Sequence, residues 1–111
     1  MSYSTEELKK IAVNVRRGII EAVYNAQSGH PGGALSCTDI LVDLYFNEMN
    51  IDPKNPRMEN RDRFILSKGH ASPAIYSTLA NRGFFPVEEL KTFRKIDSFL
   101  QGHPDLNKVP G

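Results

Sequence analysis

The stretch that most constrains the fold is residues 63–74, where an apolar run passes through a glycine turn into the start of a helix. The run 64–66, Phe-Ile-Leu, predicts a strand that is buried on both faces, as in a parallel sheet. Gly69 permits the sharp turn, while Ser72 and Pro73 suit the N-cap and the first position of a helix. This order of strand, turn and helix predicts an α/β fold.

His70 lies on that turn. In open α/β sheets, ligands bind where the strands end, and a helix N-terminus offers free N–H groups to an anion. Two interpretations of His70 therefore stay open at this point. It is either an anion-binding residue or an ordinary surface histidine on a connecting loop.

Length and charge indicate one small domain, with 111 residues, a net charge of +1 and interspersed acids and bases. This charge balance predicts no nucleic-acid partner, and no apolar run approaches the ~18 residues that a membrane span needs. Cys37 is the single cysteine, which excludes an internal disulfide and fits a reducing compartment. Since the N-terminus lacks the apolar core of a signal peptide, we expect a cytoplasmic protein without a membrane partner.

The first helix is the best-patterned element of the chain. Ser4 and Glu7 form a capping-box pattern, and apolar residues recur at helical spacing after it. The helix is expected to end near Ala26 or Gln27, because the glycines and proline of residues 28–33 do not continue it.

Further helices are predicted after residue 35. Ser36 is the expected cap of a second helix, with Asp39 as its acidic partner. Its predicted apolar face consists of Ile40, Leu41, Leu44, Tyr45 and Met49.

A third helix runs from Pro73 to a C-terminal glycine, Gly83, and a short one follows Pro86. The inward side chains of that short helix are predicted to be Val87, Leu90 and Phe93. Because one strand is not a sheet, the chain is predicted to be the first part of a larger α/β domain.

The three histidines, His30, His70 and His103, each follow a glycine, and two of them also precede a proline. Such turns hold an imidazole at a loop site, where it can bond hydroxyls or phosphates and exchange a proton near neutral pH. The loop 28–33 has more glycines than a plain connector needs, which favours a functional role. A zinc site is the rival interpretation, but no two histidines have short ligand spacing.

Three segments resemble motifs of the transketolases, namely residues 28–35 (SGHPGGAL), 60–71 (NRDRFILSKGHA) and 102–111 (GHPDLNKVPG). They follow the family's order and span nearly the whole chain. The resemblance implies that residues 1–111 are the incomplete N-terminal portion of a thiamine diphosphate-binding domain. That domain has three α/β/α layers, so this portion is expected to be mostly helical with one or two strands.

Transketolases move a two-carbon ketol unit from a ketose phosphate to an aldose phosphate, using thiamine diphosphate and a divalent metal, Mg or Ca. By resemblance, His70 is the cofactor-binding residue and contacts the diphosphate. His30 and His103 are by resemblance the catalytic residues, which bind the hydroxyls of the sugar phosphate and assist proton transfer. The family's metal-holding Gly-Asp-Gly segment does not occur in these residues, so the metal ligands are expected outside this chain.

The resemblance also implies a dimeric enzyme of the pentose phosphate pathway, completed by the remaining transketolase domains or by a separate C-terminal subunit. The 111-residue chain alone is then expected to be inactive. Two related families share parts of these motifs: the thiamine-dependent subunit of 2-oxoacid dehydrogenases, which lacks a loop like residues 28–35, and deoxyxylulose-phosphate synthase. A non-catalytic truncated fragment is the alternative of another class.

Overall fold

Helix α1 (Thr5–Ala26) begins at the predicted capping box in the computed structural model, which describes residues 3–29, 31–105 and 107–111. The Glu7 N–H donates to Ser4 Oγ over 3.1 Å, and the Ser4 N–H donates to the Glu7 carboxylate over 2.9 Å. The helix ends at Gln27, whose φ of 53° is left-handed. Both predicted ends of this helix are therefore confirmed.

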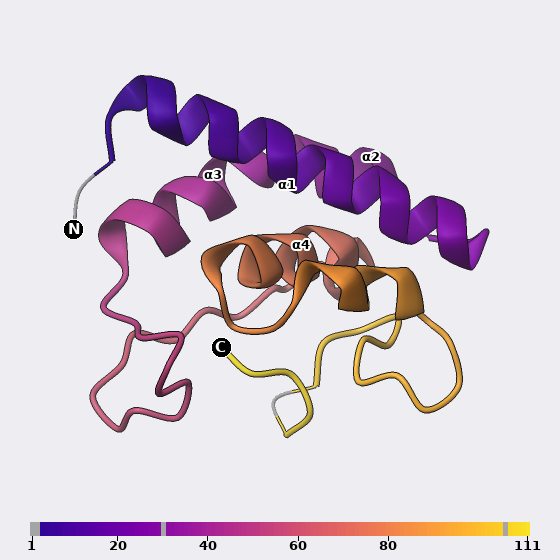
Figure 1. Cartoon of the computed structure of the whole chain (residues 1–111). Coiled ribbons are helices and arrows are strands. Elements are labelled where there is room, and N and C mark those ends of the chain that lie inside the picture. Colours follow the sequence, from indigo (N-terminus) through magenta and orange to yellow (C-terminus); the bar gives the residue numbers. More distant parts are fainter. Residues whose placement is uncertain (1–2, 30, 106) are drawn as a thin grey trace.

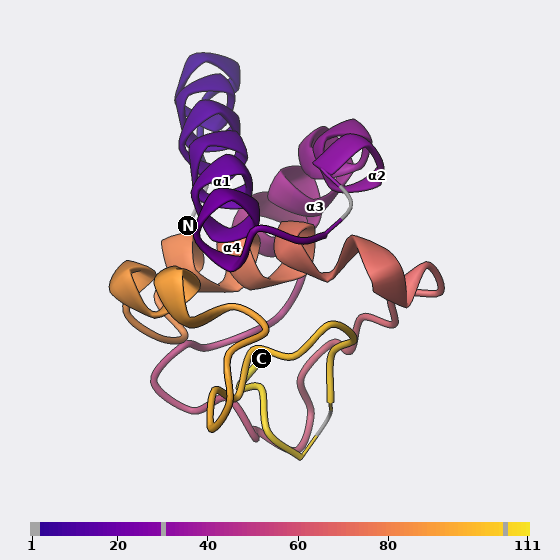
Figure 2. The same cartoon turned by 90° about the vertical axis from the view of Figure 1, so that its right-hand side faces the viewer.

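Helix α4 (Ser72–Arg82) lies at the centre of the molecule. Figures 1 and 2 show α1 on one side of it and the irregular segments of the chain on the other. Val15 and Ile19 of α1 join Tyr76 and Leu79 of α4 in one buried core cluster. Burying side chains of this size stabilises the fold by roughly 1.5–3 kcal/mol each. Every residue of α4 from Ser72 to Ala80 is buried, so α4 is the core element to which the other parts are attached.

A close helix contact joins α1 to α4 at Gly18. A Cβ atom at this position would lie 3.0 Å from Leu90 Cδ1 and closer still to Ser77 Oγ. Ser77 uses the space to donate a hydrogen bond of 2.7 Å to the Val15 carbonyl. The glycine therefore sets the distance between the two helices.

The second helical region begins at Pro31, six residues before the start that a cap at Ser36 predicts. Helix α2 (Pro31–Ser36) and helix α3 (Thr38–Asp43) are separated at Cys37, and a π-helical turn, η1 (Leu44–Glu48), follows. The Ser36 hydroxyl donates to the Gly33 carbonyl over 2.9 Å, within α2, so it does not cap α3 as expected. The buried face is Leu41, Val42, Tyr45 and Phe46, and the predicted inward residue Ile40 is 64% exposed.

The strand predicted at residues 64–66 is not formed. Residues 61–66 have no regular structure, the part of the chain that the structure describes holds no β-strand, and Ile65 is 86% exposed. The physical reason is that a strand exists only through hydrogen bonds to a neighbouring strand, and these described residues supply none. The expectation of a mostly helical chain is confirmed, while the expectation of one or two strands is not.

The turn after residue 66 becomes helical at Gly69. The 3-10 helix η2 (Gly69–Ala71) leads directly into α4, with Pro73 in the first turn as predicted. The Ser72 side chain does not cap α4, because its hydroxyl donates to the carbonyl of Gly102. Gly83 ends the helix with a left-handed φ of 109°, which confirms that prediction.

The last helical element is the 3-10 helix η3 (Val87–Thr92). Leu90 and Phe93 are buried as predicted, but Val87 is 44% exposed.

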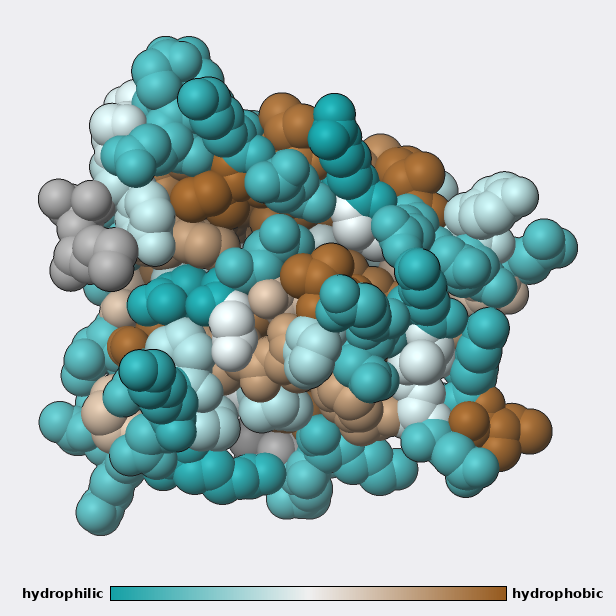
Figure 3. All heavy atoms as spheres, viewed as in Figure 1, coloured by the Kyte–Doolittle hydropathy of each residue, from teal (hydrophilic) through white to brown (hydrophobic). Residues whose placement is uncertain are grey.

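Two apolar side chains of α1, Val13 and Ile20, lie at the surface and are about half exposed. Figure 3 shows the corresponding upper edge of the molecule as brown patches separated by hydrophilic side chains. Among the described residues, no helix combines the length and the apolar character needed to cross a membrane.

Candidate functional site

The structure brings His70 and His103, two of the three predicted site residues, to one pocket. The pocket has a volume of about 630 Å³, and both imidazoles lie among its exposed lining residues. His103 packs directly on Gly69, since a Cβ atom at Gly69 would lie 2.5 Å from Cδ2 of the His103 ring. His30 lies outside the described residues, so its prediction is not tested.

Two hydroxyls of α4 hold the segment that carries His103. Ser72 Oγ donates to the Gly102 carbonyl over 2.8 Å, and the Tyr76 hydroxyl donates to the Gln101 carbonyl over 2.5 Å. Both donors are on fully buried residues. Burial raises the pKa of the Tyr76 hydroxyl well above its usual range, so this group stays protonated and remains a donor.

Helix α2 meets the same turn from the other side. The Lys68 ammonium donates to the Gly33 carbonyl over 2.9 Å and to Ser36 Oγ over 3.4 Å. A Cβ atom at Gly33 would lie 3.8 Å from His70 Nε2 and 3.9 Å from Lys68 Nζ. The C-terminal half of the predicted loop 28–33 is therefore helical and lies beside His70.

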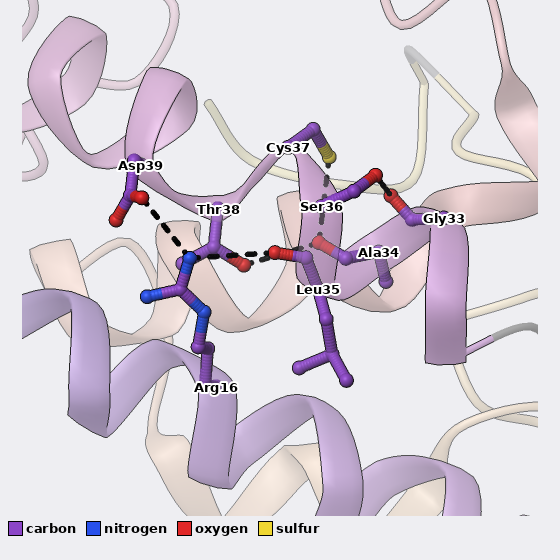
Figure 4. Close-up of polar contacts among 8 residues, drawn as sticks. All are labelled: Arg16, Gly33, Ala34, Leu35, Ser36, Cys37, Thr38 and Asp39. Atoms are coloured by element: carbon purple, nitrogen blue, oxygen red, sulfur yellow. Dashed lines mark hydrogen bonds and ion pairs between the residues drawn. The ribbon is translucent and has the colours of Figure 1, made fainter.

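Arg16 ties α2 and α3 to the first helix. Figure 4 shows its guanidinium between the two elements, donating to the Leu35 carbonyl over 3.5 Å and forming an ion pair of 3.2 Å with Asp39. Inside this pair of helices, Thr38 Oγ1 donates to the Ala34 carbonyl over 3.0 Å. These contacts fix α2, and with it Gly33, on the scaffold formed by α1.

The pocket is lined by basic and apolar side chains besides its histidines. Its charged lining residues besides histidine are Arg57, Arg61, Arg63 and Asp105. Its main apolar lining residues are Tyr45, Phe64, Leu66, Ile75, Leu79 and Val109. Burial raises the pKa of Tyr45 to about 12, so this side chain remains neutral. A pocket with three cations and one acid favours an anionic ligand.

A diphosphate fits this set of groups. His70 lines the pocket beside three arginines, and an imidazole is able to donate a hydrogen bond to a phosphate oxygen. No metal-binding group of side chains is present in residues 3–29, 31–105 and 107–111, because no three His, Cys, Asp or Glu side chains are grouped there to bind an ion. His30, one of the three histidines of the zinc interpretation, lies outside these residues, so that interpretation is not tested.

Sequence reasoning missed three residues that build this site. Gly69 was assigned to a turn, yet it is also the surface on which His103 packs. Ser72 was assigned to a helix cap, and Tyr76 was given no role. The sequence did contain one signal for Ser72 and Tyr76. They are hydroxyl residues four positions apart in a predicted helix, so they lie on one face of it and are able to bind the same segment.

Residues 8–111 match the family model described as the transketolase thiamine diphosphate-binding domain. The chain is 40% identical over its full 111 residues to a 6-deoxy-6-sulfo-D-fructose transketolase subunit from Clostridium sp. (strain MSTE9), covering 40% of that protein. It is 45% identical over 104 residues, 93% of its length, to a transketolase of Buchnera aphidicola from Acyrthosiphon pisum, of which it covers 16%.

The solved structure of transketolase from Campylobacter jejuni superposes with a TM-score of 0.87 at 37% identity, over 97% of this chain and 17% of that one. The chain thus spans 40% of one curated relative and 16% of the other. Because the family model covers nearly all of it, this chain belongs to the transketolase family, within the thiamine diphosphate-binding domain.

Proposed function

We propose that this chain forms part of the active site of an enzyme that transfers a two-carbon ketol unit from a ketose phosphate to an aldose phosphate. The observation that carries the proposal is the meeting of His70 and His103 at one basic pocket, with the His103 ring packed on Gly69. Membership of the transketolase family supports the same reaction. Thiamine diphosphate, when bound, supplies the carbanion stabilisation that ketol transfer needs.

In this proposal His70 donates a hydrogen bond to a diphosphate oxygen. Arg57, Arg61 and Arg63, which line the same pocket, add positive charge. His103, which lines the pocket, bonds the hydroxyls of the sugar and moves a proton to or from them. His30 shares these two roles with His103, on the basis of its Gly-His-Pro setting in the sequence.

The proposal also includes parts that lie beyond these residues. We assign residues 1–111 to the incomplete N-terminal portion of the diphosphate-binding domain, supported by their coverage of 40% and 16% of two relatives. The remaining domains, or a separate C-terminal subunit, would complete a dimeric enzyme and hold a divalent metal, Mg or Ca. One relative is named a transketolase subunit, which supports the separate form. The single cysteine supports a cytoplasmic location.

The experiment is a calorimetric titration of the complete assembled enzyme with thiamine diphosphate. Replacing His70→Ala removes one hydrogen bond to a charged group, a loss of about 1.5–3 kcal/mol, or roughly ten- to hundredfold in affinity. Lys10→Ala is the control, because Lys10 is an exposed cation of α1 outside the pocket lining. An unchanged affinity in His70→Ala, or an equal loss in the control, would contradict the assignment.

A further inference from the structure

We propose that Ser72 and Tyr76 are positioning residues for His103, acting as a two-hydroxyl clamp from helix α4. This inference rests on the proposed function, because it assigns His103 a place beside the reacting sugar. The clamp itself consists of contacts that the structure shows. It names two residues that act on the reaction without touching the substrate.

The clamp holds two consecutive carbonyls. Ser72 and Tyr76 are four residues apart, on one face of α4, and they donate to Gly102 and Gln101 over 2.8 and 2.5 Å. His103 is the next residue of the chain, and it is exposed at the pocket. The backbone immediately before the imidazole is therefore attached to the most buried helix of the molecule.

The donors themselves are held in place. Both residues are 0% exposed, and the Tyr76 ring packs edge-on against Phe93 with the ring centroids 5.9 Å apart. A further contact holds the residue before this segment, because the Arg94 N–H donates to the Leu100 carbonyl over 2.8 Å. Both donors therefore belong to the packed interior of the molecule.

Gly69 limits the imidazole on its other side. The His103 ring lies against the backbone of η2, because its Cδ2 is only 2.5 Å from the position that a Gly69 Cβ would take. Loss of the clamp would let residues 101–103 shift away from this surface. A misplacement of ~1 Å in a catalytic group is able to cost ~100-fold in rate, so small shifts matter.

The test uses the complete enzyme with its other domains or subunit. Tyr76→Phe and Ser72→Ala each remove one hydroxyl, and the double variant removes both. We expect the double variant to lower kcat at least tenfold, while thiamine diphosphate affinity stays within about twofold, because His70 is untouched. Ser77→Ala is the matched control, since Ser77 is a buried hydroxyl of the same helix whose bond goes to the Val15 carbonyl. It should leave kcat within twofold, even where it lowers the melting temperature as much.

A double-mutant cycle shows whether the clamp acts through His103. In a His103→Ala background, removing the two hydroxyls should cost no further kcat. An equal loss in both backgrounds, or a loss of kcat in Ser77→Ala matching that of the double variant, would overturn the proposal.

A spectroscopic readout keeps the clamp testable if the reaction itself has been misassigned. With labelled histidine in the complete protein, the NMR signal of the His103 imidazole is identified by its disappearance in His103→Ala. The clamp variants should shift or broaden this signal, and Ser77→Ala should leave it in place. If His103→Ala does not lower kcat, the proposed function fails, but the NMR result still decides the clamp. A His103 signal that is unchanged in the double variant would refute it.

Discussion

Gly69→Ala is the sharpest test of how the two histidines are placed. The new Cβ would lie 2.5 Å from Cδ2 of His103, whereas ordinary contact begins at 3.4 Å, so the ring must retreat by about 0.9 Å. The backbone accepts alanine here, because Gly69 is not among the described glycines with positive φ. A displacement of ~1 Å is able to cost ~100-fold in rate, and we expect a loss of kcat of that order with little change in stability.

The assay is steady-state ketol transfer by the complete enzyme, with thermal unfolding as the check on folding. Gly102→Ala is the matched control: it changes the glycine next to His103, but its Cβ would meet Arg94 at an ordinary distance of 3.5 Å. We expect that variant to keep kcat within a few-fold of the parent. A Gly69→Ala enzyme that also stays within a few-fold, or a Gly102→Ala enzyme that loses as much, would refute the reasoning.

Two further predictions concern α1. Gly18→Ala forces a Cβ against Ser77 and Leu90, so we expect a net loss of about 1–3 kcal/mol, since overpacking outweighs the helix propensity gained, and thermal unfolding measures it. Hydrogen bonds from the Ser4 N–H and then the Ser4 hydroxyl hold the pKa of Glu7 below its ordinary value. Ionised Glu7 therefore stabilises the helix at pH values above its pKa in the unfolded chain. This stabilisation is lost as the pH falls through its lower pKa in the folded chain. The protection factors of the first-turn amides, which remove the intrinsic pH dependence of exchange, should therefore fall in the parent as the pH drops below the ordinary pKa of glutamate. They should depend less on pH in Glu7→Gln, and identical pH profiles of the protection factors would contradict the assignment.

The sequence predicted best those features that depend on near neighbours. The α1 capping box joins residues three apart, and the stop at Gly83 depends on the φ of one residue, so local chemistry decides both. The strand at 64–66 failed because strands require partners from elsewhere in a fold. Ser36 and Ser72 do not cap their helices as predicted, because their hydroxyls donate hydrogen bonds to carbonyls instead. One of these carbonyls lies within α2 and the other lies 30 residues away in the sequence.

The same contrast between features set by near neighbours in the sequence and features set by distant ones applies to the candidate site. That His70 and His103 belong together followed from their Gly-His settings and from the resemblance, and both line the pocket. The contact between Gly69 and the His103 ring joins segments 34 residues apart, as its sequence positions show. No periodicity encodes such a contact. It follows from the packing of α4, which holds both segments.

The attachment of both histidines to α4 has a consequence for how the enzyme would be put together. His70 lies on the turn that runs directly into α4, and the segment before His103 is bonded to the first turns of the same helix. A hinge motion or the docking of another subunit would therefore carry the two imidazoles as one rigid body. Contacts within this chain, and not contacts with a partner, therefore set the spacing of the two imidazoles.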